Sequence, residues 1–170
     1  MQIDYLIKVQ YSAAMTSIRI GIAAAAVVTI VVYALGSGYW VSSDSGWYRS
    51  LIQPSWQPPD WVFGLIWPYN FIMLGIVAVV IARTAALPAA LIWLVFLILS
   101  VIAALAWSYL FYVPHLLPQA AIALSITALL TIPIIVITFQ TQLRYGWLLL
   151  PYQLWLIIAA SLSIGYALKN

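Results

Sequence analysis

Aromatic rings, rather than ionisable groups, are the side chains of this sequence best placed to recognise a ligand. Four tryptophans and three prolines lie in the single run from Trp47 to Trp67. Proline fixes φ and removes an amide donor, so this run has few backbone conformations available. Tryptophan offers a broad apolar face and one N–H donor, which suits a membrane interface or a ligand pocket. The run therefore predicts a stiff aromatic flap over the mouth of a helical bundle.

A stripe of rings continues into the segment that follows this run. Phe63, Trp67 and Phe71 recur at four-residue spacing, so they share one face of the helix expected there. Trp107 and Trp155 lie in later apolar segments. The residues by themselves leave two interpretations open for these tryptophans, which either line a pocket or simply pack against neighbouring helices and lipid.

The groups that most enzymes need are missing from the apolar stretches. With the first stretch taken from Ile20, just after Arg19, they contain no Asp, Glu, Lys or Arg, which argues against a proton relay or ion-coupled transport. Paired carboxylates, catalytic triads, phosphate loops and metal-ligand spacings are absent, so neither acid–base hydrolysis nor a metal site is expected. Without cysteine, disulfides and thiolate ligands are excluded. The single histidine, His115, lies between two prolines and is either an interfacial loop residue or an axial haem ligand.

Composition places the chain in a membrane. It is 66% hydrophobic and 5% charged, whereas a soluble domain is about 25% charged. The six basic residues are scattered, which predicts no nucleic-acid partner. We expect an all-α fold, an integral membrane bundle of five transmembrane helices in one domain of residues 1–170. The expected spans are residues 18–36, 61–82, 89–113, 119–139 and 147–168, with an aromatic loop at 37–60.

Charges and turns mark the ends of these spans. The segment from Trp61 to Ala82 carries no charge and makes about 33 Å of helix, enough to cross a bilayer. The first apolar segment is either an uncleaved helix, which we expect, or a cleaved signal peptide. Trp40, Trp93 and Trp147 lie near span ends and are predicted to be interfacial belt residues.

The distribution of positive residues predicts the orientation. The side that holds the N-terminus has four of them and the opposite side two, which favours a cytoplasmic N-terminus. The four are Lys8, Arg19, Arg83 and Arg144, and the two are Arg49 and Lys169.

Three motifs carry a resemblance to a known family. The string WYxxLxxPSWxPPxWxFGxxW is found at residues 47–67, with Gly75 two turns later. It resembles the pattern typical of the translocator proteins, also called tryptophan-rich sensory proteins or peripheral benzodiazepine receptors. LLLPYQLW at 148–155 and AWSYLFY at 106–112 are similar to segments of that family's fifth and third helices. The resemblance covers roughly residues 20–170.

The resemblance implies a five-helix membrane fold, often a homodimer, with a ligand pocket under the first loop. Family members bind porphyrins such as protoporphyrin IX and haem, sterols in animals, and benzodiazepine-type drugs. It therefore implies a membrane receptor or sensor for flat apolar ligands, linked to tetrapyrrole regulation or stress, with porphyrin or haem as ligand and no required cofactor. A facilitative transporter or scavenger is one alternative. A light-dependent porphyrin-degrading enzyme is another, with Trp67 and Trp155 as candidate electron or radical partners.

Ten positions match the family's pocket motifs and are the expected ligand-binding residues. They are Trp47, Tyr48 and Pro58 from the loop, Phe63, Trp67 and Phe71 from the second helix, Trp107 and Ser108 from the third, and Trp155 and Ala159 from the fifth.

Several departures from the family pattern reduce the number of polar side chains that could contact a ligand. Ala104 and Ser163 stand where the family usually carries asparagine, and Phe71 where it carries tyrosine. Gln53 replaces a lysine that would meet a porphyrin propionate, which leaves Arg49 as the nearby cation. We expect Asn70 or Ser108 to supply the missing polar contact.

Small residues on the third helix bear on self-association. Ser100, Ala104 and Ser108 repeat at four-residue spacing, which lets helices approach closely. Because two of these positions also suit the pocket, Ala103 or Ala106 is the better candidate for a homodimer interface. Packing within one chain is the alternative.

Overall fold

The computed structural model describes residues 2–41 and 45–170, apart from the side chains of residues 4–9 and 45. Within this part α-helix is the only regular secondary structure, and five of the helices are long and apolar enough to cross a membrane. The all-α, five-span fold class is thereby confirmed. The helices are α1 (Gln2–Val41), α2 (Ser45–Ser50), α3 (Asp60–Thr84), α4 (Leu87–Tyr112), α5 (Leu117–Thr141) and α6 (Leu143–Lys169).

The first helix and the loop after it differ from the prediction. Helix α1 continues to Val41, α2 covers Ser45–Ser50 and α3 begins at Asp60. Of the described residues in the expected aromatic loop at 37–60, only residues 51–59 are therefore non-helical, and the rest of that prediction was wrong for the described residues. The Gly36-Ser37-Gly38 segment does not end α1. The Ser37 hydroxyl donates to Tyr33 O at 2.7 Å, and a Cβ at Gly36 would lie 2.8 Å from Leu105 Cδ2, so α1 rests closely on α4. This packing against α4 keeps the Gly36-Ser37-Gly38 segment helical although glycine has a low helix propensity. Asp44 lies outside the described residues.

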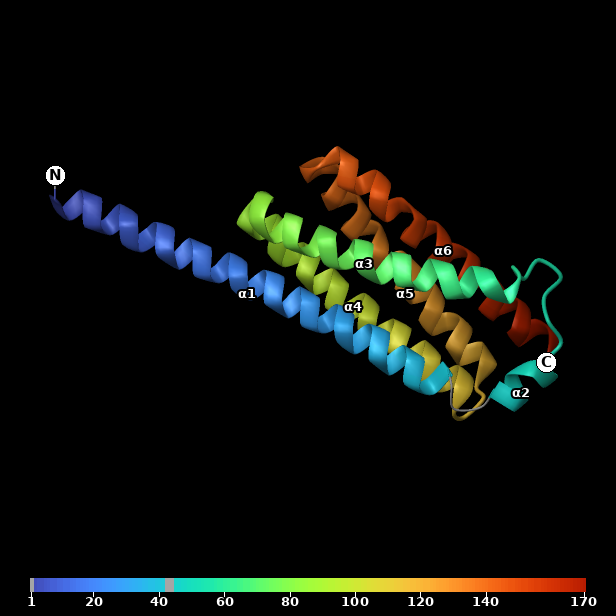
Figure 1. Ribbon diagram of the computed structural model, residues 1–170. Helices are drawn as coiled ribbons and strands as arrows, with labels where there is room; N and C mark the ends of the chain where they lie inside the picture. Colours follow the sequence, from blue (N-terminus) through green and yellow to red (C-terminus); the bar gives the residue numbers. More distant parts are fainter. Residues whose placement is uncertain (1, 42–44) are drawn as a thin grey trace.

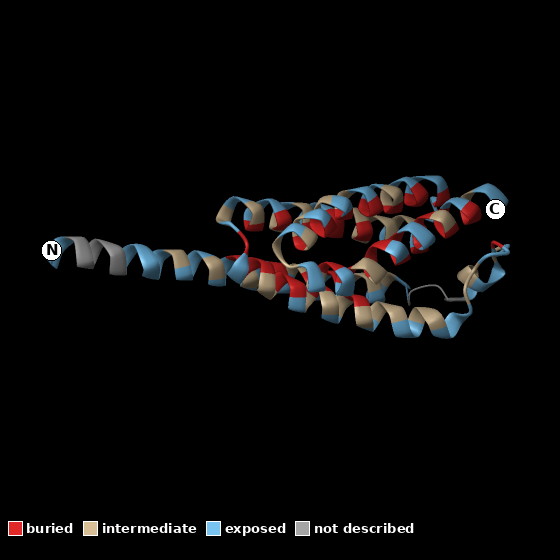
Figure 2. Cartoon of the chain, turned by 90° about the horizontal axis from the view of Figure 1, so that it is seen from above, coloured by how far each residue is buried: buried red, intermediate tan, exposed pale blue. Residues whose placement is uncertain are grey.

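The five long helices pack side by side (Figure 1). Helix α1 packs against α3 and α4, while α5 packs chiefly against α4 and α6. The N-terminal part of α1 projects beyond the bundle, and α2 and the C-terminus lie together at the opposite end. Figure 2 shows buried residues on the helix sides that face one another and exposed residues on the outer sides. Many of the exposed side chains are large and aliphatic, as expected for a lipid-facing surface.

A few polar side chains join neighbouring helices. Arg19 of α1 donates to the carbonyls of Ala82 and Ala85 at 2.7 and 3.0 Å, where α3 ends. Trp93 of α4 is 1% exposed and donates from Nε1 to Thr138 Oγ1 of α5 at 3.1 Å. The prediction that Trp93 is an interfacial belt residue was therefore wrong, because it faces the interior of the bundle and not the lipid.

Helices α5 and α6 are joined by an amide. Gln153 accepts from Thr131 Oγ1 at 2.6 Å and donates to Ala128 O at 2.9 Å. These bonds satisfy a side chain that is only 8% exposed, which matters because an unpaired polar group in an apolar interior is costly.

The small-residue strip on α4 faces inward. Ser100, Ala104 and Ser108 are all buried within the chain, so their spacing serves close packing inside the bundle. Ala103 and Ala106 are half-buried, and a homodimer through them stays a prediction.

Candidate functional site

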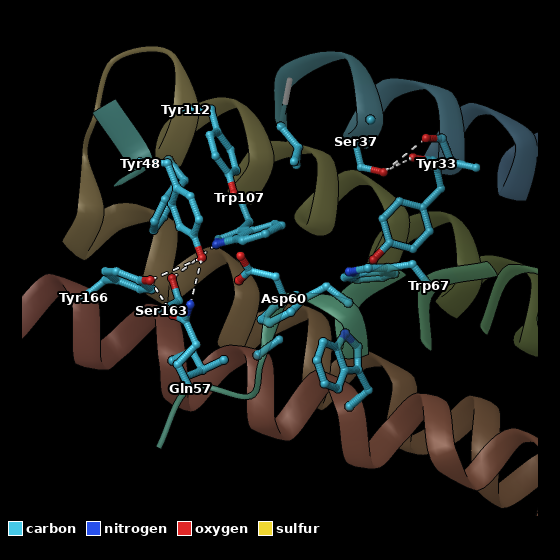
Figure 3. A pocket seen from close by; sticks show the side chains of 18 of the residues that line it. Tyr33, Ser37, Tyr48, Gln57, Asp60, Trp67, Trp107, Tyr112, Ser163 and Tyr166 are labelled. Atoms are coloured by element: carbon cyan, nitrogen blue, oxygen red, sulfur yellow. Dashed lines mark hydrogen bonds between the residues drawn. The ribbon is translucent and has the colours of Figure 1, made fainter. Parts of the chain in front are cut away.

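A cavity of about 480 Å³ lies at the end of the bundle that holds α2 and the C-terminus. Its lining comes from α1, α2, α3, α4 and α6 and from the connecting segment 51–59, which we call the lid. The volume falls within the range of about 300–1,000 Å³ that is typical of small-molecule pockets. Figure 3 shows aromatic side chains from several helices pointing into this space.

Rings from α3 and α6 form one wall. Trp67 stacks on Phe71, with ring centroids 5.7 Å apart and an interplanar angle of 25°. Trp155 lies edge-on to Trp67 at 6.4 Å and to Phe63 at 5.0 Å. The predicted stripe of Phe63, Trp67 and Phe71 therefore meets α6 through the Trp155 ring, in the edge-to-face arrangement that aromatic pairs prefer.

Helices α1 and α4 supply further rings. Tyr33 lies edge-on to Trp67 at 6.2 Å and to Phe71 at 5.1 Å. On α4, Trp107 lies edge-on to Tyr112 at 6.2 Å. The Trp107 Nε1–H donates to Ser163 Oγ of α6 at 3.2 Å, which holds the indole in place across two helices.

A cluster of hydrogen bonds closes the cavity on the lid side. The Tyr166 hydroxyl donates to Gln57 Oε1 and also lies 3.2 Å from the Tyr48 hydroxyl. Gln57 Nε2 donates to Tyr48 Oη at 3.3 Å. The cluster joins α2, the lid and α6, as the dashed lines in Figure 3 indicate.

The lid is also attached to the end of α6. The Ile52 amide donates to Asn170 Oδ1 at 2.8 Å, and Asn170 Nδ2 donates to Ile52 O at 3.3 Å. Trp56 Nε1 donates to Ser161 Oγ at 3.2 Å. Lys169 Nζ also donates to Gln53 O at 3.3 Å. The lid therefore has three points of attachment to α6 and its C-terminal neighbour Asn170, in addition to the tyrosine cluster.

Two charged side chains are among the residues that line the cavity. Arg49 lies in the last turn of α2 and Asp60 in the first turn of α3. Both are exposed at the rim, whereas the rings that line the cavity are buried or half-buried. The rim thus carries one positive and one negative charge above an apolar interior.

Comparison with known proteins identifies the family. The model of the TspO/MBR family matches residues 20–168. The chain belongs to the TspO/MBR family. It is 31% identical to the tryptophan-rich protein TspO of Bacillus cereus, over 79% of this chain and 92% of that protein. It is 29% identical to the membrane protein YtaB of Bacillus subtilis, over 84% of this chain and 93% of YtaB. It is 27% identical to protein CrtK of Rhodobacter capsulatus, over 74% of this chain and 79% of CrtK.

Membership confirms the resemblance seen in the motifs, and the structure shows where the matched residues lie in this TspO/MBR protein. Seven of the ten expected ligand-binding residues line the cavity. These are Tyr48, Phe63, Trp67, Phe71, Trp107, Trp155 and Ala159.

The other three expected residues, Trp47, Pro58 and Ser108, lie outside the cavity lining. Trp47 packs beneath α2, edge-on to Phe111 at 5.5 Å and stacked on His115 at 3.7 Å. Ser108 is completely buried, because its face of α4 points into the bundle.

Two further polar candidates also lie elsewhere. Asn70 is completely buried and is not a lining residue, so it does not supply the polar contact expected of it. His115 lies in the α4–α5 turn with a left-handed φ of 57° and is likewise outside the lining. An axial haem ligand at His115 would have to lie outside this cavity.

Several lining residues were not expected from the sequence. They are Tyr33, Gln57, Asp60, Phe111, Tyr112 and Tyr166, among others. Gln57 and Asp60 lie inside the proline-rich run, where a polar residue directly beside a proline is a usable signal. The tyrosines carry no such signal, since their inward direction depends on how the helices pack.

Proposed function

We propose that this integral membrane protein is a receptor or sensor that binds flat apolar ligands of the porphyrin class, such as protoporphyrin IX or haem. The observation that carries the proposal is the aromatic cavity under the lid. Trp67 and Trp107 lie on different sides of it (Figure 3), and Phe63 and Trp155 line it as well. Planar π surfaces pack favourably on a planar conjugated ring without needing a titratable partner.

The position of the cavity favours binding over transport through the bundle. Its lining belongs to the half of the bundle nearest the lid. The other half of α3 is packed, with Leu74, Val77 and Ile81 at 0% exposed. A ligand held at one end, above a close-packed core, fits a receptor better than a continuous passage.

Titration with protoporphyrin IX in the dark tests the proposal, following tryptophan quenching and the porphyrin spectrum together. The parent protein is expected to show saturable quenching. Trp155→Leu removes a cavity wall and is expected to weaken binding about tenfold, since loss of a buried aromatic contact is worth roughly 1–2 kcal/mol. Trp147→Leu is the matched control, because Trp147 is 61% exposed and outside the cavity. Quenching that rises linearly without saturation would refute porphyrin binding.

A photochemical function is the second candidate, and one contact favours it. Trp67 and Trp155 line the cavity and touch each other, with ring centroids 6.4 Å apart. Both are therefore placed to donate an electron to one bound, light-excited porphyrin, which gives a porphyrin radical anion and a tryptophan radical cation; breakdown of the ring then consumes dissolved dioxygen as the oxidant. Illumination is expected to bleach the porphyrin Soret band with the parent protein, and more slowly with Trp67→Phe or Trp155→Phe. If both variants bleach porphyrin at the parent rate, the photochemical function is excluded.

A further inference from the structure

Asp60 is an acidic side chain in a cavity whose lining is mainly aromatic and apolar. It starts α3, lines the cavity, and in Figure 3 its carboxylate points into the space bordered by Trp107 and Trp67. Arg49 is the other charged residue among the described lining residues and lies on a different helix, α2. Asp60 therefore presents a negative charge directly to whatever occupies the cavity.

Asp60 has no evident structural partner. In residues 2–41 and 45–170 its carboxylate forms no ion pair, and α3 has no side-chain cap. A carboxylate in the first turn does favour a helix through the helix dipole. The helix dipole stabilises any carboxylate in the first turn, whichever way its side chain points. It therefore does not explain why the Asp60 carboxylate points toward the cavity.

A carboxylate beside aromatic faces is the arrangement that recognises organic cations. A cation is attracted to the face of Trp or Tyr, and the attraction grows where water is excluded. Trp107, Tyr48 and Trp67 line the same cavity as Asp60. In addition, position 53 of the lid, where a lysine would balance an anionic ligand, is the neutral Gln53.

We propose that Asp60 sets the charge class of the ligand, so that the cavity prefers flat ligands with a cationic group to those with two carboxylates. The inference rests on the proposed function and narrows it: within the porphyrin class, protoporphyrin IX and haem, with two carboxylates each, bind more weakly than porphyrins with cationic side arms. The positive charge of Arg49 does not remove this preference. Arg49 can pair with one carboxylate of a ligand, while the second carboxylate meets the negative charge of Asp60. Like charges brought together in this way reduce affinity.

Three porphyrins that share the same macrocycle but differ in the charge of their side arms test the inference. They are protoporphyrin IX with its two propionates, its neutral dimethyl ester, and a diamide whose two arms end in quaternary ammonium groups. Each is titrated into the parent protein and Asp60→Asn in nanodiscs of zwitterionic phosphatidylcholine, so that the lipid adds no charge preference. Asp60→Asn is expected to bind the dianion about two- to fivefold more tightly and the dication about two- to fivefold more weakly, the size of one partly exposed charge pair. The ester is expected to bind both proteins equally.

Arg49→Gln provides a control of opposite sign, since it should weaken dianion binding and strengthen dication binding. The two proposals fail separately. If the neutral ester binds neither protein saturably, the proposed porphyrin function is overturned together with the inference. If the ester binds both proteins but Asp60→Asn leaves the ratio of dication to dianion affinity unchanged, only the role of Asp60 is overturned.

Discussion

Replacing Gly165 with alanine is expected to loosen the lid. Gly165 lies in α6 where the lid crosses it, and a Cβ there would lie 2.8 Å from Pro54 Cγ and 2.9 Å from Trp56 Cζ2. Both neighbours are ring atoms. Pro54 is buried, and Trp56, although 52% exposed, is held by its hydrogen bond to Ser161, so a shift of either ring disturbs the contact between the lid and α6. The lid therefore has to shift away from α6 to admit one methyl group.

The size of the effect follows from two opposing terms. Forcing an extra carbon into a packed contact costs about 1–3 kcal/mol, while Gly→Ala inside a helix returns roughly 1 kcal/mol. The helix gain is present whether the lid is attached or not, so only the packing term acts on lid closure. Even the lower limit of about 1 kcal/mol shifts the balance toward the open lid by about fivefold.

Two measurements report on the lid. Hydrogen exchange of the lid peptide should accelerate about fivefold, because among the described residues the Ile52 amide donates to Asn170 Oδ1 alone. The rate of porphyrin release after rapid mixing should rise by a similar factor. Gly75→Ala is the matched control, since a Cβ at Gly75 meets nothing within 4 Å. The reasoning is refuted if Gly165→Ala and Gly75→Ala show equal lid exchange and equal release rates.

Two further substitutions test the polar contacts that hold the bundle together. Arg19→Gln removes two charge-assisted hydrogen bonds to the end of α3 and should lower the unfolding free energy in detergent by about 2 kcal/mol. Arg19→Lys should recover part of this loss. An unchanged Tm for Arg19→Gln would contradict a stabilising role of Arg19 between α1 and α3. Gln153→Leu leaves the Thr131 hydroxyl without its α6 partner and should cost about 1–2 kcal/mol. Thr29→Val, which alters a hydrogen bond within one helix only, is the control and should change unfolding far less.

The spans were predictable because hydropathy and charge act locally. Crossing a bilayer requires about 20 apolar residues whatever the rest of the chain does. The segment from Trp61 to Ala82 meets this condition by itself, and the structure extends it only to Asp60–Thr84. The common face of Phe63, Trp67 and Phe71 was likewise visible, because four-residue spacing is a property of the single helix.

Predictions failed where a contact between helices decides the outcome. Trp93 has the sequence position of an interfacial residue, yet its indole donates to Thr138 on another helix. Ser108 lies one residue after Trp107, and the 100° turn between them sends one side chain into the cavity and the other into the core. Such differences depend on the rotation of each helix, which packing sets.

The sequence by itself determined the membrane class, the five spans, the stiff aromatic run and the family. Each depends on composition or on short motifs that act within one segment. Only the tertiary structure decided that Tyr33, Tyr166 and Asp60 face the same cavity as Trp67, and that the lid rests on Gly165. These residues come from three helices that are far apart in the chain, and their convergence depends on the rotation of each helix in the bundle. A cavity is a property of several packed surfaces, so no single segment encodes it.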